Sequence, residues 1–76
     1  MNTEELVKEL VAARHRREMT QKELAERMGC HVTFVQRIEG NKGDRQVSQL
    51  FRYAEALGVK IGFYINDNIY SEVTGL

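Results

Sequence analysis

Hydrophobic residues along the first 58 positions recur three or four residues apart with polar residues between them, as in helices that bury one face. This spacing predicts four helices, at residues 3–17, 20–28, 32–39 and 47–57. In the fourth, the apolar positions are Val47, Leu50, Phe51, Ala54 and Leu57. The second has the clearest start, because Thr20 and Glu23 have the spacing of a capping box, in which each side chain bonds the other's backbone amide.

After the fourth predicted helix the period of the pattern changes to two. Residues 59–65 place Ile61, Phe63 and Ile65 on one side of a segment rich in strong β formers, which predicts a strand. A turn signal separates it from residues 69–76, which form either a second strand or a tail. The expected fold class is therefore mainly α, with four compact helices and a short C-terminal β-strand or hairpin.

The length of the chain, 76 residues, leaves room for one small domain, expected over residues 1–76. Its single cysteine excludes an internal disulfide and suits a reducing, cytoplasmic setting. No apolar run approaches the ~20 residues that a membrane span needs, so we expect no membrane partner.

Basic and acidic residues balance, with eleven of each, but they are unevenly distributed. Residues 27–52 carry five basic and two acidic side chains, a net charge of +3, whereas the segments on either side are net acidic. A net charge of zero gives no overall basic field that would attract nucleic acid, but it does not exclude a basic face. The third predicted helix lies in the positive segment.

The spacing of a helix-turn-helix unit is also present, carried by Gln21, Ala25, Gly29, Val35 and Ile38. In such a unit two short helices cross at roughly 90–120° through a tight turn, so the first needs a small side chain at the crossing, here Ala25. Gly29 suits the backbone of the turn, and Val35 and Ile38 face inward. The opposite side of the second helix is then free to lie in the major groove of DNA, which admits one α-helix.

With Glu39 in register, these residues resemble the helix-turn-helix family of lambdoid phage repressors, Cro and the DNA-binding antitoxins of bacterial toxin–antitoxin pairs, over about residues 4–58. The resemblance implies a compact four-helix, repressor-like fold, a bacterial or phage-encoded protein, and double-stranded DNA as the partner. It also implies an ion pair between Arg14 and Glu39, the alternative being two unrelated surface charges.

The residues expected to contact DNA bases lie on the third predicted helix and are Val32, Thr33, Gln36 and Arg37. The expected phosphate contacts, at the start of the second predicted helix and around the third, are Gln21, His31, Asn41, Lys42 and Arg45. Arg37 suits a pair of hydrogen bonds to O6 and N7 of guanine, although a solvated arginine is the plain alternative. Val32 and Thr33 carry methyl groups that suit contact with thymine methyls.

Two features depart from the family pattern. The place where the family often has Ser or Thr as the cap of the recognition helix is held by Cys30 or His31, which are weaker caps. The β-type run at residues 59–65 replaces the fifth helix of phage repressors and resembles the antitoxin branch, in which a C-terminal strand pairs between subunits. Because an unpaired strand edge needs a partner, we expect a homodimer interface at Ile61, Phe63, Tyr64 and Ile65.

His15, Cys30 and His31 do not suggest a metal site, because structural zinc usually takes four ligands and no fourth nitrogen or sulfur ligand accompanies them. The chain has no glycine-rich phosphate loop and no nucleophile–base arrangement, so we expect no cofactor and no enzymatic activity.

The leading hypothesis is a sequence-specific DNA-binding transcriptional repressor that acts as a homodimer on a near-palindromic operator. One alternative is an antitoxin that autoregulates its operon and binds a toxin protein. The other is a protein-interaction module that does not bind DNA, which the neutral net charge favours.

Overall fold

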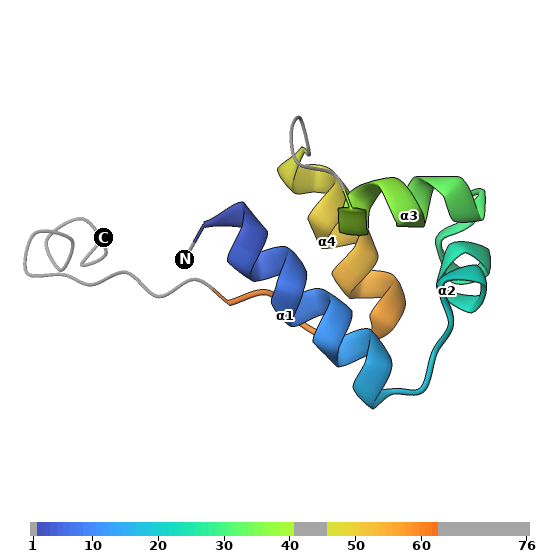
Figure 1. Ribbon diagram of the computed structural model, residues 1–76, viewed down its shortest axis with the longest axis horizontal. Helices are drawn as coiled ribbons and strands as arrows, with labels where there is room; N and C mark the ends of the chain where they lie inside the picture. The colour runs from blue at the N-terminus through green and yellow to red at the C-terminus, as the bar shows by residue number, and fades with distance from the viewer. Residues whose placement is uncertain (1, 41–45, 63–76) are drawn as a thin grey trace, which may run out of the picture.

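The structure, a computed structural model, describes residues 2–40 and 46–62. Within these ranges it contains four helices: α1 (Thr3–Arg16), α2 (Gln21–Met28), α3 (Val32–Gly40) and α4 (Val47–Leu57). α2 and α3 follow one another through a tight turn at one end of the molecule, α4 contacts both of them, and α1 contacts α3 and α4 (Figure 1). The mainly α fold class is confirmed, and α1 and α3 each end one residue from the predicted bound.

Polar side chains begin the first two helices by accepting hydrogen bonds from free backbone amides. The Oδ1 atom of Asn2 accepts from the N–H of Glu5 at 2.8 Å. Thr20 precedes α2 in an extended conformation, and its Oγ1 atom accepts from the N–H of Glu23 at 3.0 Å. The Glu23 carboxylate accepts in turn from the Thr20 N–H at 2.8 Å. The predicted capping box is present, and α2 begins one residue after the predicted bound because Thr20 is its cap.

A left-handed backbone conformation ends α2 and α4. The φ angle is 69° at Gly29 and 87° at Gly58, a region in which glycine meets no steric penalty. After α2, the N–H of Cys30 donates to the carbonyl oxygen of Ala25 at 3.0 Å, which satisfies an acceptor that the helix leaves free. The chain therefore leaves α2 in a fixed direction, toward α3.

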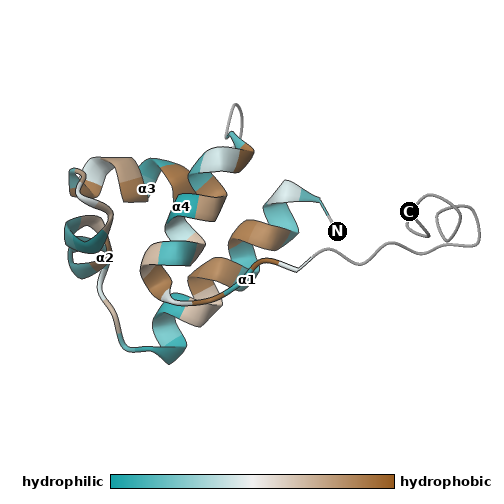
Figure 2. Cartoon of the chain, turned by 180° about the vertical axis from the view of Figure 1, so that it is seen from behind, coloured by the Kyte–Doolittle hydropathy of each residue, from teal (hydrophilic) through white to brown (hydrophobic). Residues whose placement is uncertain are grey.

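All four helices contribute to one hydrophobic core. Its buried apolar residues are Val7, Leu10, Ala13, Leu24, Ala25, Val35, Ile38, Leu50, Tyr53, Ala54 and Leu57. Hydrophobic residues recur along α1, α3 and α4, whereas α2 is mostly hydrophilic and has two fully buried residues (Figure 2). A helix of eight residues is marginal on its own, so this packing holds α2 in place.

The buried face of α4 differs in part from the expected apolar stripe. Val47 and Phe51 are 53% and 42% exposed, although the spacing predicted both as apolar core positions. Tyr53 is completely buried on the other side of the stripe. The buried face of α4 is therefore centred between Leu50 and Leu57, and Val47 and Phe51 lie at its margin.

The segment after α4 lies beside α1 (Figures 1 and 2), and Val59 and Ile61 pack against the core. Residues 59–62 form neither helix nor strand. A strand is defined by hydrogen bonds to a neighbouring strand, and the described part of the chain offers no second strand. Residues 63–65 of the predicted strand, and residues 69–76, lie outside the described residues.

None of the helices in residues 2–40 and 46–62 has the length and apolarity that a membrane-spanning helix requires.

Candidate nucleic-acid interface

The unit formed by α2, the turn and α3 is held by small and apolar side chains at the predicted spacing. Ala25 on α2 is 2% exposed, and because its side chain is small, the neighbouring helices can pack close to α2 at this position. Val35 and Ile38 on α3 are completely or almost completely buried in the core. Because these inner residues fix the rotation of α3 about its axis, they also determine which residues face solvent.

The outer face of α3 is polar and carries one positive charge. A rotation of 100° per residue places Thr33, Gln36 and Arg37 opposite Val35 and Ile38, and all three are exposed. The side chains of Gln36 and Arg37 make no hydrogen bond or ion pair within the described part of the chain. Among the described residues, no group therefore competes with an external ligand for these side chains.

Val32, the fourth predicted base contact, is only half-exposed and packs partly against the core at the margin of this face.

His31 is the cap of α3, which decides between the two alternatives left open by the sequence. Its Nδ1 atom accepts a hydrogen bond from the backbone N–H of Thr33 at 3.1 Å and lies 2.8 Å from the Thr33 Oγ1 atom. Cys30, by contrast, is half-buried and packs against the core. An imidazole thus takes the place that Ser or Thr often occupies before a recognition helix.

Glu39, near the end of α3, is the centre of a hydrogen-bonded cluster. Arg14 on α1 donates to it twice, from Nε to Oε2 at 2.8 Å and from Nη2 to Oε1 at 3.0 Å. Gln21 donates from Nε2 to Oε1 at 2.9 Å, and the hydroxyl of Tyr53 donates to Oε2. The ion pair implied by the resemblance is therefore present, and Gln21 and Tyr53 extend it to α2 and α4.

Burial and hydrogen bonding act in opposite directions on the charge of Glu39. Burial alone would raise the pKa of its carboxyl, but the hydrogen bonds from Arg14, Tyr53 and Gln21 lower this pKa below its ordinary value. Burial and the hydrogen bond to Glu39 raise the pKa of the Tyr53 phenol well above its ordinary value. Glu39 is therefore held as a carboxylate and Tyr53 as a neutral donor.

Gln21 has a different neighbour from the one expected. Its side-chain amide nitrogen donates to Glu39 inside the protein, so a phosphate contact by this side chain has to use its remaining donor hydrogen. Tyr53 was not anticipated as a member of this cluster. The sequence signal was its spacing, three residues after Leu50 and four before Leu57, which places it on the buried side of α4.

Arg52 on α4 is a second residue that the sequence did not reveal. Its Nη2 atom donates to the carbonyl oxygen of Met28 at 3.2 Å, and its guanidinium lies 5.5 Å from the centre of the Phe34 ring. Met28 ends α2 and Phe34 lies in the first turn of α3. Arg52 therefore ties α4 to both sides of the turn that joins these helices.

Several predicted contacts lie outside the described residues. These are the phosphate contacts Asn41, Lys42 and Arg45 and the interface residues Phe63, Tyr64 and Ile65. Ile61, the remaining interface residue, is half-buried against the core of its own chain.

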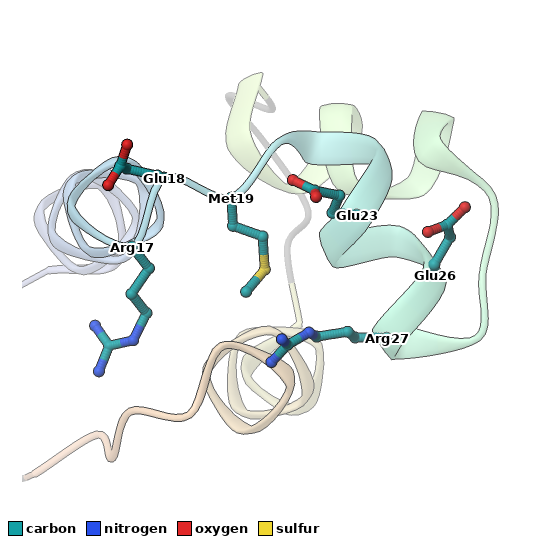
Figure 3. Close-up of a pocket in the computed structure, with 6 residues that line it drawn as sticks. All are labelled: Arg17, Glu18, Met19, Glu23, Glu26 and Arg27. Atoms are coloured by element: carbon teal, nitrogen blue, oxygen red, sulfur yellow. The ribbon is translucent and has the colours of Figure 1, made fainter.

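A hollow of about 420 Å³ lies between the end of α1 and α2 (Figure 3). Its lining residues are Arg17, Glu18, Met19, Glu23, Glu26 and Arg27. Met19 extends into it with Arg17 and Arg27 on either side, so its walls carry both signs of charge (Figure 3). Within residues 2–40 and 46–62, no group of three His, Cys, Asp or Glu side chains is placed to hold a metal ion.

A comparison with protein families gives one match, in which the model of the helix-turn-helix family aligns with residues 10–64. This range is more than half of the chain and includes all of α2, α3 and α4. Comparisons with curated proteins and with solved structures give no match.

Proposed function

The chain belongs to the Cro/C1-type helix-turn-helix family of DNA-binding regulators, and we propose that it is a sequence-specific transcriptional repressor. In this proposal a homodimer places its two α3 helices in the major groove of a near-palindromic operator, about 34 Å apart. The bound dimer represses by occluding a promoter, and the protein has no catalytic step.

The observation that supports DNA binding best is the contrast between the two sides of α3. Its inner side is anchored by Val35, Ile38 and the Glu39 cluster. Its outer side presents Gln36 and Arg37 without a partner in the described residues. An arginine in this position can donate to O6 and N7 of guanine, the commonest specific contact in protein–DNA complexes. Gln21, His31, Asn41, Lys42 and Arg45 are the proposed phosphate contacts.

Exposed apolar groups on α4 support the homodimer. Val47 and Phe51 are exposed, and a hollow of about 570 Å³ beside Phe51 is lined in part by Ala54, Val59 and Ile61. Apolar residues gathered around a hollow are typical of surfaces that a partner covers. We propose that a second copy covers this surface, with an interface that includes Ile61, Phe63, Tyr64 and Ile65.

Selection of bound sequences from a random DNA pool tests the proposed function. A palindromic consensus is expected, and its half-site spacing should equal one turn of DNA or a multiple of it. Titration of the selected site at 50 and 200 mM salt should give an affinity that falls steeply, because phosphate contacts release counterions. Weak, salt-insensitive binding without a consensus would instead favour a protein-interaction module.

Sedimentation of Phe63→Asp tests the homodimer. A buried charge at the interface should give a monomer with greatly weakened operator binding, because one α3 helix then contacts only one half-site. A variant that remains a tight dimer would locate the interface elsewhere on the chain.

A further inference from the structure

The hydrogen bonds around His31 determine where its imidazole proton lies. The backbone N–H of Thr33 points at the Nδ1 atom from 3.1 Å. A donor can bond only to an unprotonated ring nitrogen, so the proton of the neutral ring is on Nε2 and Nδ1 is an acceptor.

The same contact determines the direction of the Thr33 hydroxyl. Its Oγ1 atom lies 2.8 Å from Nδ1. Two lone pairs facing each other at this distance would repel, so the hydroxyl hydrogen lies between the two atoms and Thr33 is the donor. The backbone N–H and the hydroxyl share the single Nδ1 lone pair. With its hydrogen directed at the imidazole, the exposed hydroxyl offers only acceptor lone pairs on the outer face of α3.

We propose that His31 makes Thr33 an acceptor-only reader of DNA bases, which selects an amino base over a keto base at the position that Thr33 faces. This inference rests on the proposed function, in which α3 lies in the major groove. Adenine N6 and cytosine N4 are donors there, whereas guanine O6 and thymine O4 are acceptors. An acceptor-only hydroxyl pairs with the first two and is repelled by the others. His31 is a positioning residue in this arrangement, because it acts through Thr33.

An unconstrained threonine would not discriminate in this way. A free hydroxyl rotates to donate or to accept, and threonine therefore pairs with any of the four bases. A wrong base pair typically costs about fivefold or more in affinity. We therefore expect the wild type to favour adenine or cytosine over guanine or thymine by at least about fivefold at this position.

The test measures the affinities of the four bases at each half-site position for the wild type and three variants. All measurements are made in one buffer at pH 8. Thr33→Val keeps the shape and removes the hydroxyl, so the position whose base preference it changes is the one that Thr33 reads. His31→Ala should reduce this preference to less than about twofold, because the hydroxyl is then free to rotate.

His31→Asn is the matched control, because its side-chain oxygen accepts from the same N–H and hydroxyl. It should retain the amino preference, and circular dichroism should show both His31 variants folded. A keto preference at the Thr33 position, or equal preferences in the wild type and in His31→Ala, would overturn the inference. A selection that gives no consensus at any position would instead overturn the proposed function itself.

Discussion

The inner and outer sides of α3 differ in how their polar groups are satisfied. On the inner side, Glu39 accepts hydrogen bonds from side chains on α1, α2 and α4, and it is nine-tenths buried together with its ion-pair partner Arg14. On the outer side, Gln36 and Arg37 are exposed, and their side chains have no hydrogen-bond partner in the described part of the chain. A single nine-residue helix therefore carries a fixed scaffold on one side and available recognition groups on the other.

Because of this difference, we expect the inner side of α3 to determine stability and the outer side to determine DNA recognition. A buried polar cluster is stable only when every member is paired, so changes on the inner side should lower the free energy of unfolding. Exposed groups with no partner contribute little to folding, so changes on the outer side should alter DNA affinity and leave stability nearly unchanged.

The largest effect is expected when Glu39 is removed. Glu39→Ala leaves the Arg14 guanidinium and the Tyr53 hydroxyl buried without their acceptor, and should lower the free energy of unfolding by about 3 kcal/mol. Urea unfolding followed by circular dichroism measures this loss. A domain of this size has roughly 3–5 kcal/mol of stability in total, so this variant is expected to retain only about 0–2 kcal/mol.

Two further variants keep that experiment informative. Glu39→Gln retains one of the two acceptor oxygens, without the charge, and should lose less than Glu39→Ala. Glu4→Ala removes an exposed glutamate from α1 and should change stability by no more than about 0.5 kcal/mol. Equal stabilities for Glu39→Ala and Glu4→Ala would show that the inner side is not the scaffold.

Arg37→Ala tests the outer side. It should weaken binding to the preferred site by about 1–3 kcal/mol and relax the base preference at one position in each half-site. Its free energy of unfolding should stay within about 0.5 kcal/mol of the wild type. Fluorescence titrations and urea unfolding measure the two quantities.

Arg27→Ala is the matched control for Arg37→Ala, because it removes the same charge from a different helix. Arg27 lies in the last turn of α2 and lines the hollow of Figure 3. It should leave the base preference unchanged. If both variants lose affinity equally for all sequences, Arg37 acts through net charge and does not read a base.

A smaller effect is expected when Glu39 is protonated rather than removed. The pKa of Glu39 is lower in the folded chain than its ordinary value of 4.5, so its ionisation stabilises the fold above about pH 4.5 and this contribution is lost as the pH falls through the folded-state pKa. The contribution of Glu39 to the free energy of unfolding should therefore be constant from pH 7 to about pH 5 and decline at lower pH. Glu39→Gln should show a shallower decline, and parallel curves for the two proteins would contradict the assignment.

The local signals in the sequence were sufficient for the helices and for the turn between α2 and α3. The capping box at Thr20 and Glu23 and the glycine after Met28 act over three or four residues, so neighbours in the sequence are neighbours in space. The inward positions of Val35 and Ile38 followed from helical periodicity. The ion pair between Arg14 and Glu39, by contrast, was implied by the family resemblance, because 25 residues separate its members.

The contacts that the sequence did not reveal depend on the rotation of α4 and on single side-chain torsions. Tyr53 meets Glu39 and Arg52 meets Met28 only because α4 turns one side toward both α2 and α3. The sequence could not decide whether Cys30 or His31 caps α3. That decision required the position of the His31 Nδ1 atom, which no residue pattern encodes. Periodicity predicted Val47 as a core position, but it could not show how far the surface of the other helices extends along α4.

The smallest effect is expected at Arg52, which contacts both sides of the turn between α2 and α3. Arg52→Met keeps the apolar stem over Phe34 but removes the hydrogen bond to Met28 and the contact between the guanidinium and the ring. These exposed contacts should contribute about 0.5–1 kcal/mol to the free energy of unfolding. Lys8→Met, which removes a positive charge from an exposed residue of α1, is the control and should have no measurable effect. If Arg52→Met also matches the wild type in urea unfolding, Arg52 does not hold the turn, and the orientation of α3 depends on the core and the Glu39 cluster alone.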